Sequence, residues 1–303
     1  MERPEPRNAC PRLAVGIATT GRRGILRAAL PHLLRQARPA DMIVICAAEE
    51  ADVDRAALGE IATRTRIIFA ERGLCRQRNA ILAHVDEADI LLFLDDDFLM
   101  ASTYLAEVEQ LFAANADLVM ATGRVEADGI SGPGIALSDG LRLLDGSGYA
   151  AGPSHENPVY SAYGCNMAVR METVRSHSLA FDENLPLYGW LEDVDFSRQM
   201  ARHGRIVRSD RLRGVHLGTK SGRTSGVRLG YSQIANPIYL MRKKTMSFRH
   251  AAPQMARNLA ANTLRLAAPE PWIDRRGRLR GNLRALADLV RGRLAPQNVS
   301  ALE

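Results

Sequence analysis

Three consecutive carboxylates, Asp95, Asp96 and Asp97, are the residues of this chain whose type and spacing most clearly indicate chemistry. Two carboxylates at positions i and i+2 of a turn can converge on one hard divalent cation, which keeps waters and binds diphosphate oxygens. An Asp triplet alone is more often a solvated turn or a helix N-cap. The apolar run Ile90–Leu94 before it reverses that balance, because a buried parallel strand places its last residues at the ligand-binding edge of an α/β sheet.

A second acidic cluster, Glu192–Asp195, precedes residues with helical spacing and predicts the first turn of a helix, where acids gain from the helix dipole. The alternative to this structural role is catalytic, since one of these carboxylates could act as a general base within hydrogen-bond reach of an acceptor hydroxyl. His216 presents a similar choice between a metal ligand and an ordinary histidine at the end of a strand.

The common phosphate-binding loops are missing from the sequence, which has no G-x-x-x-x-G-K-[ST] and no G-x-G-x-x-G after its first predicted strand. Any bound nucleotide is therefore expected to need a metal ion. The segment Gly21–Gly24 (GRRG) only weakly resembles the basic, glycine-rich loop of a nucleotidyltransferase.

The elements that must position these residues are strands alternating with helices. Apolar runs rich in β-branched residues are followed by stretches with helical spacing, which predicts βα units and a mostly parallel sheet. The predicted strands are Leu13–Ala18, Met42–Cys46, Arg66–Ala70, Ile90–Leu94, Leu118–Val125 and Tyr160–Val169. The predicted helices are 26–34, 74–85, 104–112 and a segment beginning near Glu192. Pro31 is expected to kink the first helix or to lie in its first turn.

The later parts of the chain have a different composition. Gly, Ser and Pro are dense at 129–134 and 146–158, so the middle section is expected to be loop-rich, with a subdomain boundary near 125–160. The segment 218–226 (GTKSGRTSG) is expected to be a mobile basic loop of the kind that often acts as a lid. Beyond Tyr231 the chain is expected to be helical, with apolar stripes among arginines.

Charge is distributed unevenly along the 303 residues. Residues 241–303 carry 13 Lys and Arg against 4 Asp and Glu, whereas residues 1–240 carry 27 against 30. Such a tail suits an anionic surface, either lipid headgroups or nucleic acid, although a solvated helical region explains it equally well. The few aromatic residues of the tail argue against stacking on single strands, so no nucleic-acid partner is expected.

Composition limits the class of protein. A hydrophobic content of 46% supports a buried core and excludes a disordered or fibrous chain. The four cysteines lack zinc-type spacing and are expected to be reduced thiols in a cytoplasmic protein. Residues 1–11 lack the apolar run of a secretory signal, and no later window reaches eighteen uninterrupted apolar residues, so neither a signal nor a membrane-spanning segment is expected.

Four further segments, together with the second acidic cluster, occur in order along the chain with the Asp triplet and His216. They are Ile17–Arg22 (IATTGR), Arg76–Ala80 (RQRNA), Gly164–Arg170 (GCNMAVR), Phe181–Glu183 (FDE) and Glu192–Asp195 (EDVD). Together they resemble the motifs of the inverting family 2 glycosyltransferases with the GT-A fold, over about two-thirds of the chain. The resemblance implies an α/β, GT-A-like fold, with a Rossmann-related, mostly parallel sheet flanked by helices and a helical, basic C-terminal extension.

The resemblance also implies an organisation and a metal site. Residues 1–125 would form the donor-binding half, 126–230 the acceptor-binding and catalytic half, and 231–303 the extension. Asp97 would bind Mn²⁺ or Mg²⁺, with His216 as a further candidate ligand, and the metal would neutralise the leaving nucleoside diphosphate. Asp95 would contact the ribose of the donor or, through water, the metal, and Asp96 would support both carboxylates.

For the reaction itself, the resemblance implies that Asp193 takes the proton from an acceptor hydroxyl as that hydroxyl attacks the anomeric carbon from the opposite face. Glu192 would help to hold the acceptor. Thr19 and Arg22 would line the nucleotide pocket, and Arg78 would support the base or the diphosphate.

The chain departs from the family pattern after its second predicted strand. Many members have an Asp there that reads the base, whereas this strand continues into Cys46–Glu50. Glu49 is expected to replace that Asp. The base of the donor is therefore left open, with a UDP-sugar as the default for the family.

The function expected from these motifs is sugar transfer from a nucleotide sugar to a glycan or lipid-linked acceptor, in the synthesis of a surface polysaccharide. We expect the protein in the cytoplasm, with its basic tail touching the inner face of the plasma membrane. Two other hypotheses are that the protein is a GT-A-like nucleotidyltransferase, or that it is a non-catalytic protein that binds sugar nucleotides or nucleic acid.

Overall fold

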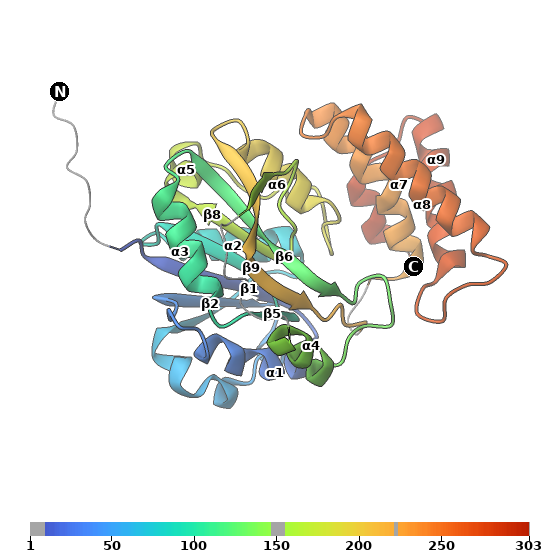
Figure 1. Cartoon of the computed structure of the whole chain (residues 1–303). Coiled ribbons are helices and arrows are strands. Elements are labelled where there is room, and N and C mark those ends of the chain that lie inside the picture. Colours follow the sequence, from blue (N-terminus) through green and yellow to red (C-terminus); the bar gives the residue numbers. More distant parts are fainter. Residues whose placement is uncertain (1–9, 147–154, 221–223, 303) are drawn as a thin grey trace, which may run out of the picture.

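The computed structural model describes residues 10–146, 155–220 and 224–302. Figure 1 shows a central sheet with helices on both faces and a separate group of C-terminal helices beside it. In chain order the elements are β1 (Leu13–Thr19), α1 (Arg23–Leu34), β2 (Met42–Ala47), η1 (Glu50–Asp52), η2 (Arg55–Arg64), β3 (Thr65–Phe69), α2 (Leu74–Leu82), β4 (Ile90–Asp95), β5 (Phe98–Met100), α3 (Tyr104–Ala114), β6 (Leu118–Asp128), α4 (Leu137–Gly146), β7 (Glu156–Pro158), β8 (Asn166–Arg170), α5 (Met171–Ser176), α6 (Glu192–Met200), β9 (Arg205–His216), α7 (Gly226–Lys243), α8 (Phe248–Leu264), α9 (Arg275–Val290) and η3 (Pro296–Ala301).

The strands form one sheet in the order β3-β2-β1-β4-β8-β6-β9-β5, and β7 pairs with β9 off this path. The first four strands are parallel to one another, as are β6 and β9, whereas β8 runs antiparallel to both of its neighbours. The expected α/β fold with a mostly parallel sheet is thus confirmed. Ala18 at the end of β1 is paired with Asp95 at the end of β4, so the segments after these strands meet at one edge.

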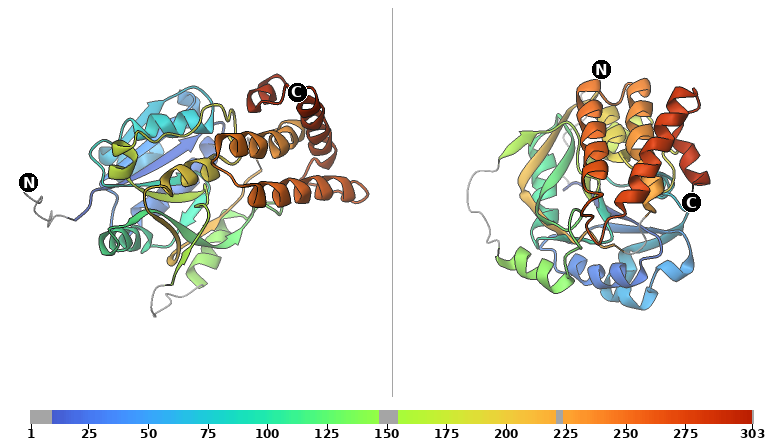
Figure 2. Two further views of the ribbon diagram at one scale, coloured as in Figure 1. Left: turned by 90° about the horizontal axis from the view of Figure 1, so that it is seen from above. Right: turned by 90° about the vertical axis from the view of Figure 1, so that its right-hand side faces the viewer.

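Alternating side chains on the strands build an apolar layer on each face of the sheet. Leu13 and Val15 of β1 belong to the core that α1 and α3 cover, whereas Ala14 belongs to the core that α2, α5 and α6 cover. A Cβ at Gly16 would lie 2.6 Å from the Ile81 side chain, so glycine lets α2 pack closely on β1. Figure 2 shows these helical layers from two further sides.

Two predicted elements were wrong in detail. The strand expected at Tyr160–Val169 begins only at Asn166. Before Asn166, backbone N–H groups donate to side chains; the N–H of Ala162, for example, donates to Ser197 Oγ. Pro31 lies in the last turn of α1 and not in its first, since the helix already begins at Arg23. The alternative, that Pro31 kinks the helix, stays a prediction.

The middle of the chain contains a helix that composition did not predict. Residues 129–134 form turns as expected, but α4 follows them. Leu137, Leu141 and Leu144 have helical spacing, and they pack on an apolar patch formed by β5 and β9. Most of the second Gly-rich segment, 147–154, lies outside the described residues.

The C-terminal helices form a bundle, defined here as α7, α8, α9 and η3. The helical region begins at Gly226, earlier than expected, and residues 221–223 of the predicted basic loop lie outside the described residues. A Cβ at Gly230 would lie 2.0 Å from the carbonyl oxygen of Arg278, so α7 and α9 touch along their backbones. Among the described helices, none has the length and apolar character needed to cross a bilayer.

The division into donor-binding, acceptor-binding and C-terminal parts stays a prediction. The first proposed boundary, at residue 125, falls inside β6, which runs from Leu118 to Asp128. The second, at residue 230, falls inside α7. Neighbouring parts are therefore joined by continuous elements of secondary structure.

Candidate active site

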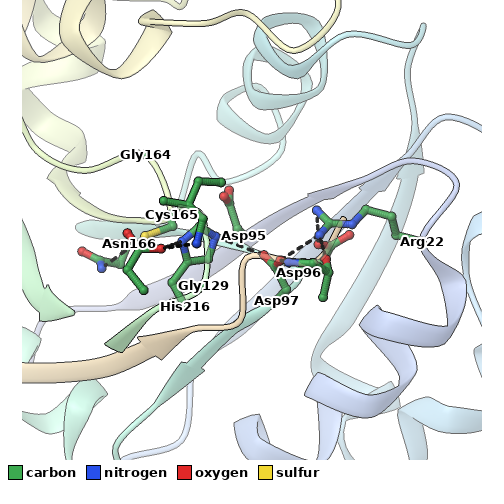
Figure 3. A network of polar contacts seen from close by, with 12 residues as sticks. Arg22, Asp95, Asp96, Asp97, Gly129, Gly164, Cys165, Asn166 and His216 are labelled. Carbon is green, nitrogen blue, oxygen red and sulfur yellow. Dashed lines mark hydrogen bonds and ion pairs between the residues drawn. The ribbon is translucent and has the colours of Figure 1, made fainter. Parts of the chain in front are cut away.

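Asp95 is the last residue of the buried strand β4, and Asp96 and Asp97 form the tight turn between β4 and β5. Figure 3 shows Arg22 reaching the triplet from one side and His216 from the other. The guanidinium of Arg22, from the turn between β1 and α1, lies 2.9 Å from Asp96 Oδ1 and 2.7 Å from Asp97 Oδ2. Asp96 and Asp97 are buried, whereas Asp95 is partly exposed.

Asp97 uses its two oxygens differently. Its Oδ2 accepts hydrogen bonds from Arg22, from the Thr219 backbone N–H at 2.9 Å and from the Thr219 hydroxyl at 2.8 Å. Its Oδ1 lies 3.4 Å from His216 Nε2. Burial acts to raise the pKa of Asp97, but the hydrogen bonds and positive charges of His216 and Arg22 outweigh burial and hold the pKa below its usual range. Asp97 is therefore an ionised carboxylate.

Asp128 orients His216. Oδ1 of Asp128, the last residue of β6, lies 2.9 Å from His216 Nδ1, and the Tyr163 hydroxyl donates to Asp128 Oδ2 at 2.9 Å. Burial disfavours the charged imidazole, but the contacts with Asp128 and Asp97 outweigh burial and raise the pKa of His216 to about 10. The ring is thus fixed with Nε2 directed at the triplet.

Asp95, Asp97 and His216 could together hold a metal ion. Each offers one ligand atom, and the three atoms lie within 4.8 Å of one another. Two carboxylate oxygens and one imidazole nitrogen suit Mn²⁺, and Mg²⁺ also accepts such a carboxylate pair with waters. The carboxylates of Asp97 and Asp128 beside His216 favour a positive charge at this position, and a divalent cation would replace the Nε2 proton.

Thr19 and Arg22 line the triplet on the side of β1. The Thr19 hydroxyl donates to Asp96 Oδ2 at 2.8 Å. Burial raises the pKa of Asp96 to about 7 against the opposing charge of Arg22. Gln77, which lies in the RQRNA segment but was assigned no role, donates through Nε2 to the carbonyl oxygens of Thr19 at 2.8 Å and Cys46 at 2.9 Å. It thereby ties the ends of β1 and β2 together.

Glu49 lies after β2 with an exposed side chain, apart from the network of contacts around the triplet. In the short segment after β2, the buried acid is Asp52, which was not predicted. Asp52 Oδ1 accepts from the Gly21 backbone N–H at 2.5 Å, and its Oδ2 accepts from that of Ala48 at 3.2 Å. Asp52 therefore fixes the turn that carries Arg22.

Arg78 joins the two acidic clusters. Its side chain is only 2% exposed, and Nη1 donates to Glu192 Oε1 at 2.7 Å. Nη2 donates to the Gly164 carbonyl oxygen at 2.7 Å and to Asp95 Oδ1 at 3.2 Å. Protein groups surround this guanidinium, and through them Arg78 supports Asp95 and Glu192. Its expected support of a base or diphosphate stays a prediction.

Asp193 lies in the first turn of α6, as predicted, and is partly exposed. Its Oδ2 accepts from the Gly164 N–H at 3.0 Å, and its Oδ1 accepts from the Val194 N–H at 2.8 Å. Burial raises the pKa of Asp193. A Cβ at Gly164 would lie 3.1 Å from Glu192 Oε1, so a glycine brings this loop close to both carboxylates.

Glu192 is more deeply buried than Asp193. Its Oε2 has no hydrogen-bond partner among the described residues, and burial raises its pKa well above the usual range. The site thus combines a candidate cation site at the sheet edge with the carboxylate of Asp193, which is suited to accept a proton. Arg78 and Gly164 connect the two parts.

Solved glycosyltransferases share this architecture. The mannosyltransferase PcManGT from Pyrobaculum calidifontis, in complex with GDP-Man and Mn²⁺, matches with a TM-score of 0.57 and 16% identity, over 97% of this chain and 87% of its own. GalNAc-T7, with UDP, GalNAc and Mn²⁺, matches with a TM-score of 0.53 and 13% identity, over 84% and 58%. TarS from S. aureus matches with a TM-score of 0.51 and 15% identity over 74% of this chain, which spans 40% of TarS.

The sheet, its helical layers and these likenesses define a protein with the GT-A glycosyltransferase fold. The chain belongs to glycosyl transferase family 2, because the sequence model of that family matches residues 14–173, more than half of its length. Among curated protein sequences, none matches it.

Proposed function

We propose that this protein is a metal-dependent, inverting glycosyltransferase that moves a sugar from a nucleotide sugar to a hydroxyl of a glycan or lipid-linked acceptor. The observation that carries the proposal is that the candidate metal site, Asp95, Asp97 and His216, is connected to Asp193. Arg78 donates to Asp95 and to the Gly164 carbonyl oxygen, and the Gly164 N–H donates to Asp193. Family membership and the GDP-Man and UDP named for PcManGT and GalNAc-T7 support a nucleotide-sugar donor.

The proposed reaction is a single displacement at the anomeric carbon. The acceptor hydroxyl donates a hydrogen bond to Asp193, which takes the proton as the oxygen attacks, and the nucleoside diphosphate leaves from the opposite face. Asp95, Asp97 and His216 would hold Mn²⁺ or Mg²⁺, whose charge would neutralise that of the leaving diphosphate. Arg78 keeps Asp95 in place.

The donor is expected to lie over the carboxyl ends of β1, β2 and β4. Thr19 and Arg22 stand beside the triplet there, and Glu49 follows β2 with its side chain open to solvent. We propose that Glu49 contacts the nucleoside. The base stays open, with UDP as the default for the family.

A thermal-shift screen tests donor binding. With Mn²⁺ present, we expect UDP, GDP, dTDP or CMP to raise Tm by roughly 5 °C at a concentration 100-fold above its Kd, because a ligand stabilises the folded state that binds it. The same nucleotide should give a much smaller shift in EDTA. If none of the four nucleotides shifts Tm with Mn²⁺ or Mg²⁺, the proposed donor site is contradicted.

The bundle also offers a surface for an anionic membrane. On α9, Arg276 and Arg280 are exposed one turn apart, and Leu283 and Val290, 55% and 88% exposed, continue along that helix. Exposed apolar residues flanked by arginines are typical of helices that lie in a membrane interface. We propose that this surface holds the enzyme on the inner face of the plasma membrane, where it would extend a surface polysaccharide.

Charge reversal tests this surface better than truncation does, because α8 and α9 cover buried residues of α7. Arg276→Glu combined with Arg280→Glu is expected to lower binding to phosphatidylglycerol-containing vesicles by at least about tenfold, since each arginine contributes about 1 kcal/mol near an anionic surface. Arg35→Glu with Arg202→Glu, exposed on the sheet domain, serves as the matched control. Equal sedimentation of all three proteins with the vesicles would contradict the proposal.

A further inference from the structure

The bundle contacts the segment that carries the proposed base, defined here as residues 182–195 and called the base segment. Lys243, the last residue of α7, donates through Nζ to Asp182 Oδ2 at 2.6 Å and to Asp195 Oδ2 at 2.7 Å. The Thr245 hydroxyl donates to Asp195 Oδ1 at 2.6 Å. Because the Asp195 side chain is 0% exposed, these contacts replace water around a buried charge.

Further contacts from the bundle reach the middle of the base segment. Asn236 of α7 donates through Nδ2 to the Trp190 carbonyl oxygen at 2.7 Å, and the Leu187 side chain packs against the apolar core of the bundle. Near the start of the segment, Asn184 Oδ1 accepts from Gln297 Nε2 at 2.7 Å. The bundle thus contacts the base segment from its first residue, Asp182, to its last, Asp195.

The backbone of the base segment needs such support. Leu187 has a φ of 59° and Leu191 a φ of 73°, so both lie in the left-handed region, which side chains other than glycine adopt at a cost. A conformation of this kind persists only where the surrounding structure holds it in place. Leu191 lies between Trp190, which Asn236 binds, and Glu192, the first residue of α6. The contact with Asn236 is therefore three residues from Asp193.

The donor site is held by other parts of the chain. The contacts of Asp96 and Asp97 described above come from Thr19, Arg22, His216 and Thr219, which all precede α7. A change in the bundle can therefore alter the position of the base while these contacts of Asp96 and Asp97 stay intact.

We propose that the bundle is part of the catalytic unit and that Lys243 is a positioning residue, which holds Asp193 in place by bridging Asp182 and Asp195. This inference rests on the proposed role of Asp193 as the base. It predicts that removing the Lys243 cation slows the chemical step far more than it weakens nucleotide binding.

The test compares Lys243→Met with Arg242→Met in the full chain. Arg242 is the neighbouring cation on α7 and has an exposed side chain, which makes its replacement a matched control. Lys243→Met is expected to lower kcat at least tenfold, to leave the Kd for nucleotide with Mn²⁺ within twofold, and to speed amide hydrogen exchange in residues 186–195 at least tenfold. Arg242→Met should change none of these, and Lys243→Arg should restore most of kcat.

Two results would overturn the proposal: a folded Lys243→Met protein with unchanged kcat, or one in which nucleotide binding falls as much as kcat. If Lys243→Met does not fold, Thr245→Val is the second variant, because it removes only the hydroxyl contact with Asp195. Its kcat should fall about threefold, and amide exchange in the base segment should be faster. Unchanged values of both would count against the proposal. The proposed function has a separate test, because a wild-type protein that binds nucleotide but transfers no sugar from any donor would refute it. In that case, hydrogen exchange in Lys243→Met would still decide whether the bundle holds the base segment.

Discussion

Replacing Asp193 by Asn is expected to lower kcat by about 10³-fold and to leave Mn²⁺-dependent nucleotide binding within about twofold. General bases typically contribute 10²- to 10⁴-fold to a rate, and an amide cannot take the proton of the acceptor hydroxyl. Asn keeps a side-chain oxygen that can accept from the Gly164 N–H, so the loop that faces Asp193 should stay in place. Single-turnover transfer measurements and calorimetry with nucleotide and Mn²⁺ check the two halves of this expectation.

The control is Asp86→Asn, an exposed carboxylate before β4, which should leave both quantities unchanged. Unchanged turnover in Asp193→Asn would remove Asp193 from the mechanism. A parallel loss of turnover and nucleotide binding would instead assign it a structural role.

The pH profile gives a second check on Asp193. Burial raises its pKa, and only the ionised carboxylate can take a proton, so kcat of the wild-type protein should fall as the pH drops through this raised pKa. The residual activity of Asp193→Asn should lack this acidic limb. An identical acidic limb in both proteins would assign the titration to another group.

The sequence allowed the positions of the two acidic clusters to be predicted because each depends on a local pattern. A continuous apolar run such as Ile90–Leu94 indicates a buried strand, and the first charged residue marks where burial ends. Acidic residues directly before helical spacing indicate the start of a helix, and α6 begins at Glu192. These two boundaries are the parts of the site that short-range patterns determine.

The residues that orient the site were not predictable in the same way. Asp52, Asp128 and Thr219 act through contacts with Gly21, His216 and Asp97, and each contact joins segments that are separate in the sequence. Only the sheet brings them together, since β6 and β9 pair so that Asp128 lies opposite His216. A single acid at the end of a strand gives no local sign of such a partner.

The C-terminal extension shows the same limit on a larger scale. Its arginines and apolar stripes indicated helices and a charged surface, which depend on composition and periodicity. The contacts of Lys243 and Asn236 with the base segment depend on how α7 docks against α6, which neither property specifies. The basic tail is thus also a tertiary support for the segment that carries Asp193.

Replacing Asp97 by Asn is expected to weaken Mn²⁺-dependent nucleotide binding by at least about 100-fold. Loss of a residue that merely orients a metal ligand typically costs 10- to 100-fold in affinity, and this change removes the charge of a proposed ligand itself. Asn has nearly the shape of Asp, and its side-chain oxygen can still accept from the Thr219 N–H, so the turn should persist. Calorimetry with nucleotide, in Mn²⁺ and in EDTA, measures the effect.

Asp96→Asn is the matched control for Asp97→Asn, because Asp96 is equally buried and also contacts Arg22 but is not part of the three-residue metal set. The nucleotide affinity of Asp96→Asn should be as much higher in Mn²⁺ than in EDTA as that of the wild-type protein. In Asp97→Asn this difference in affinity should nearly vanish. Unchanged affinity of Asp97→Asn in Mn²⁺ would refute the metal assignment. Equal losses in Mn²⁺ and EDTA would mean that Asp97 acts by holding Arg22, and the cation would then have to be sought at other ligands.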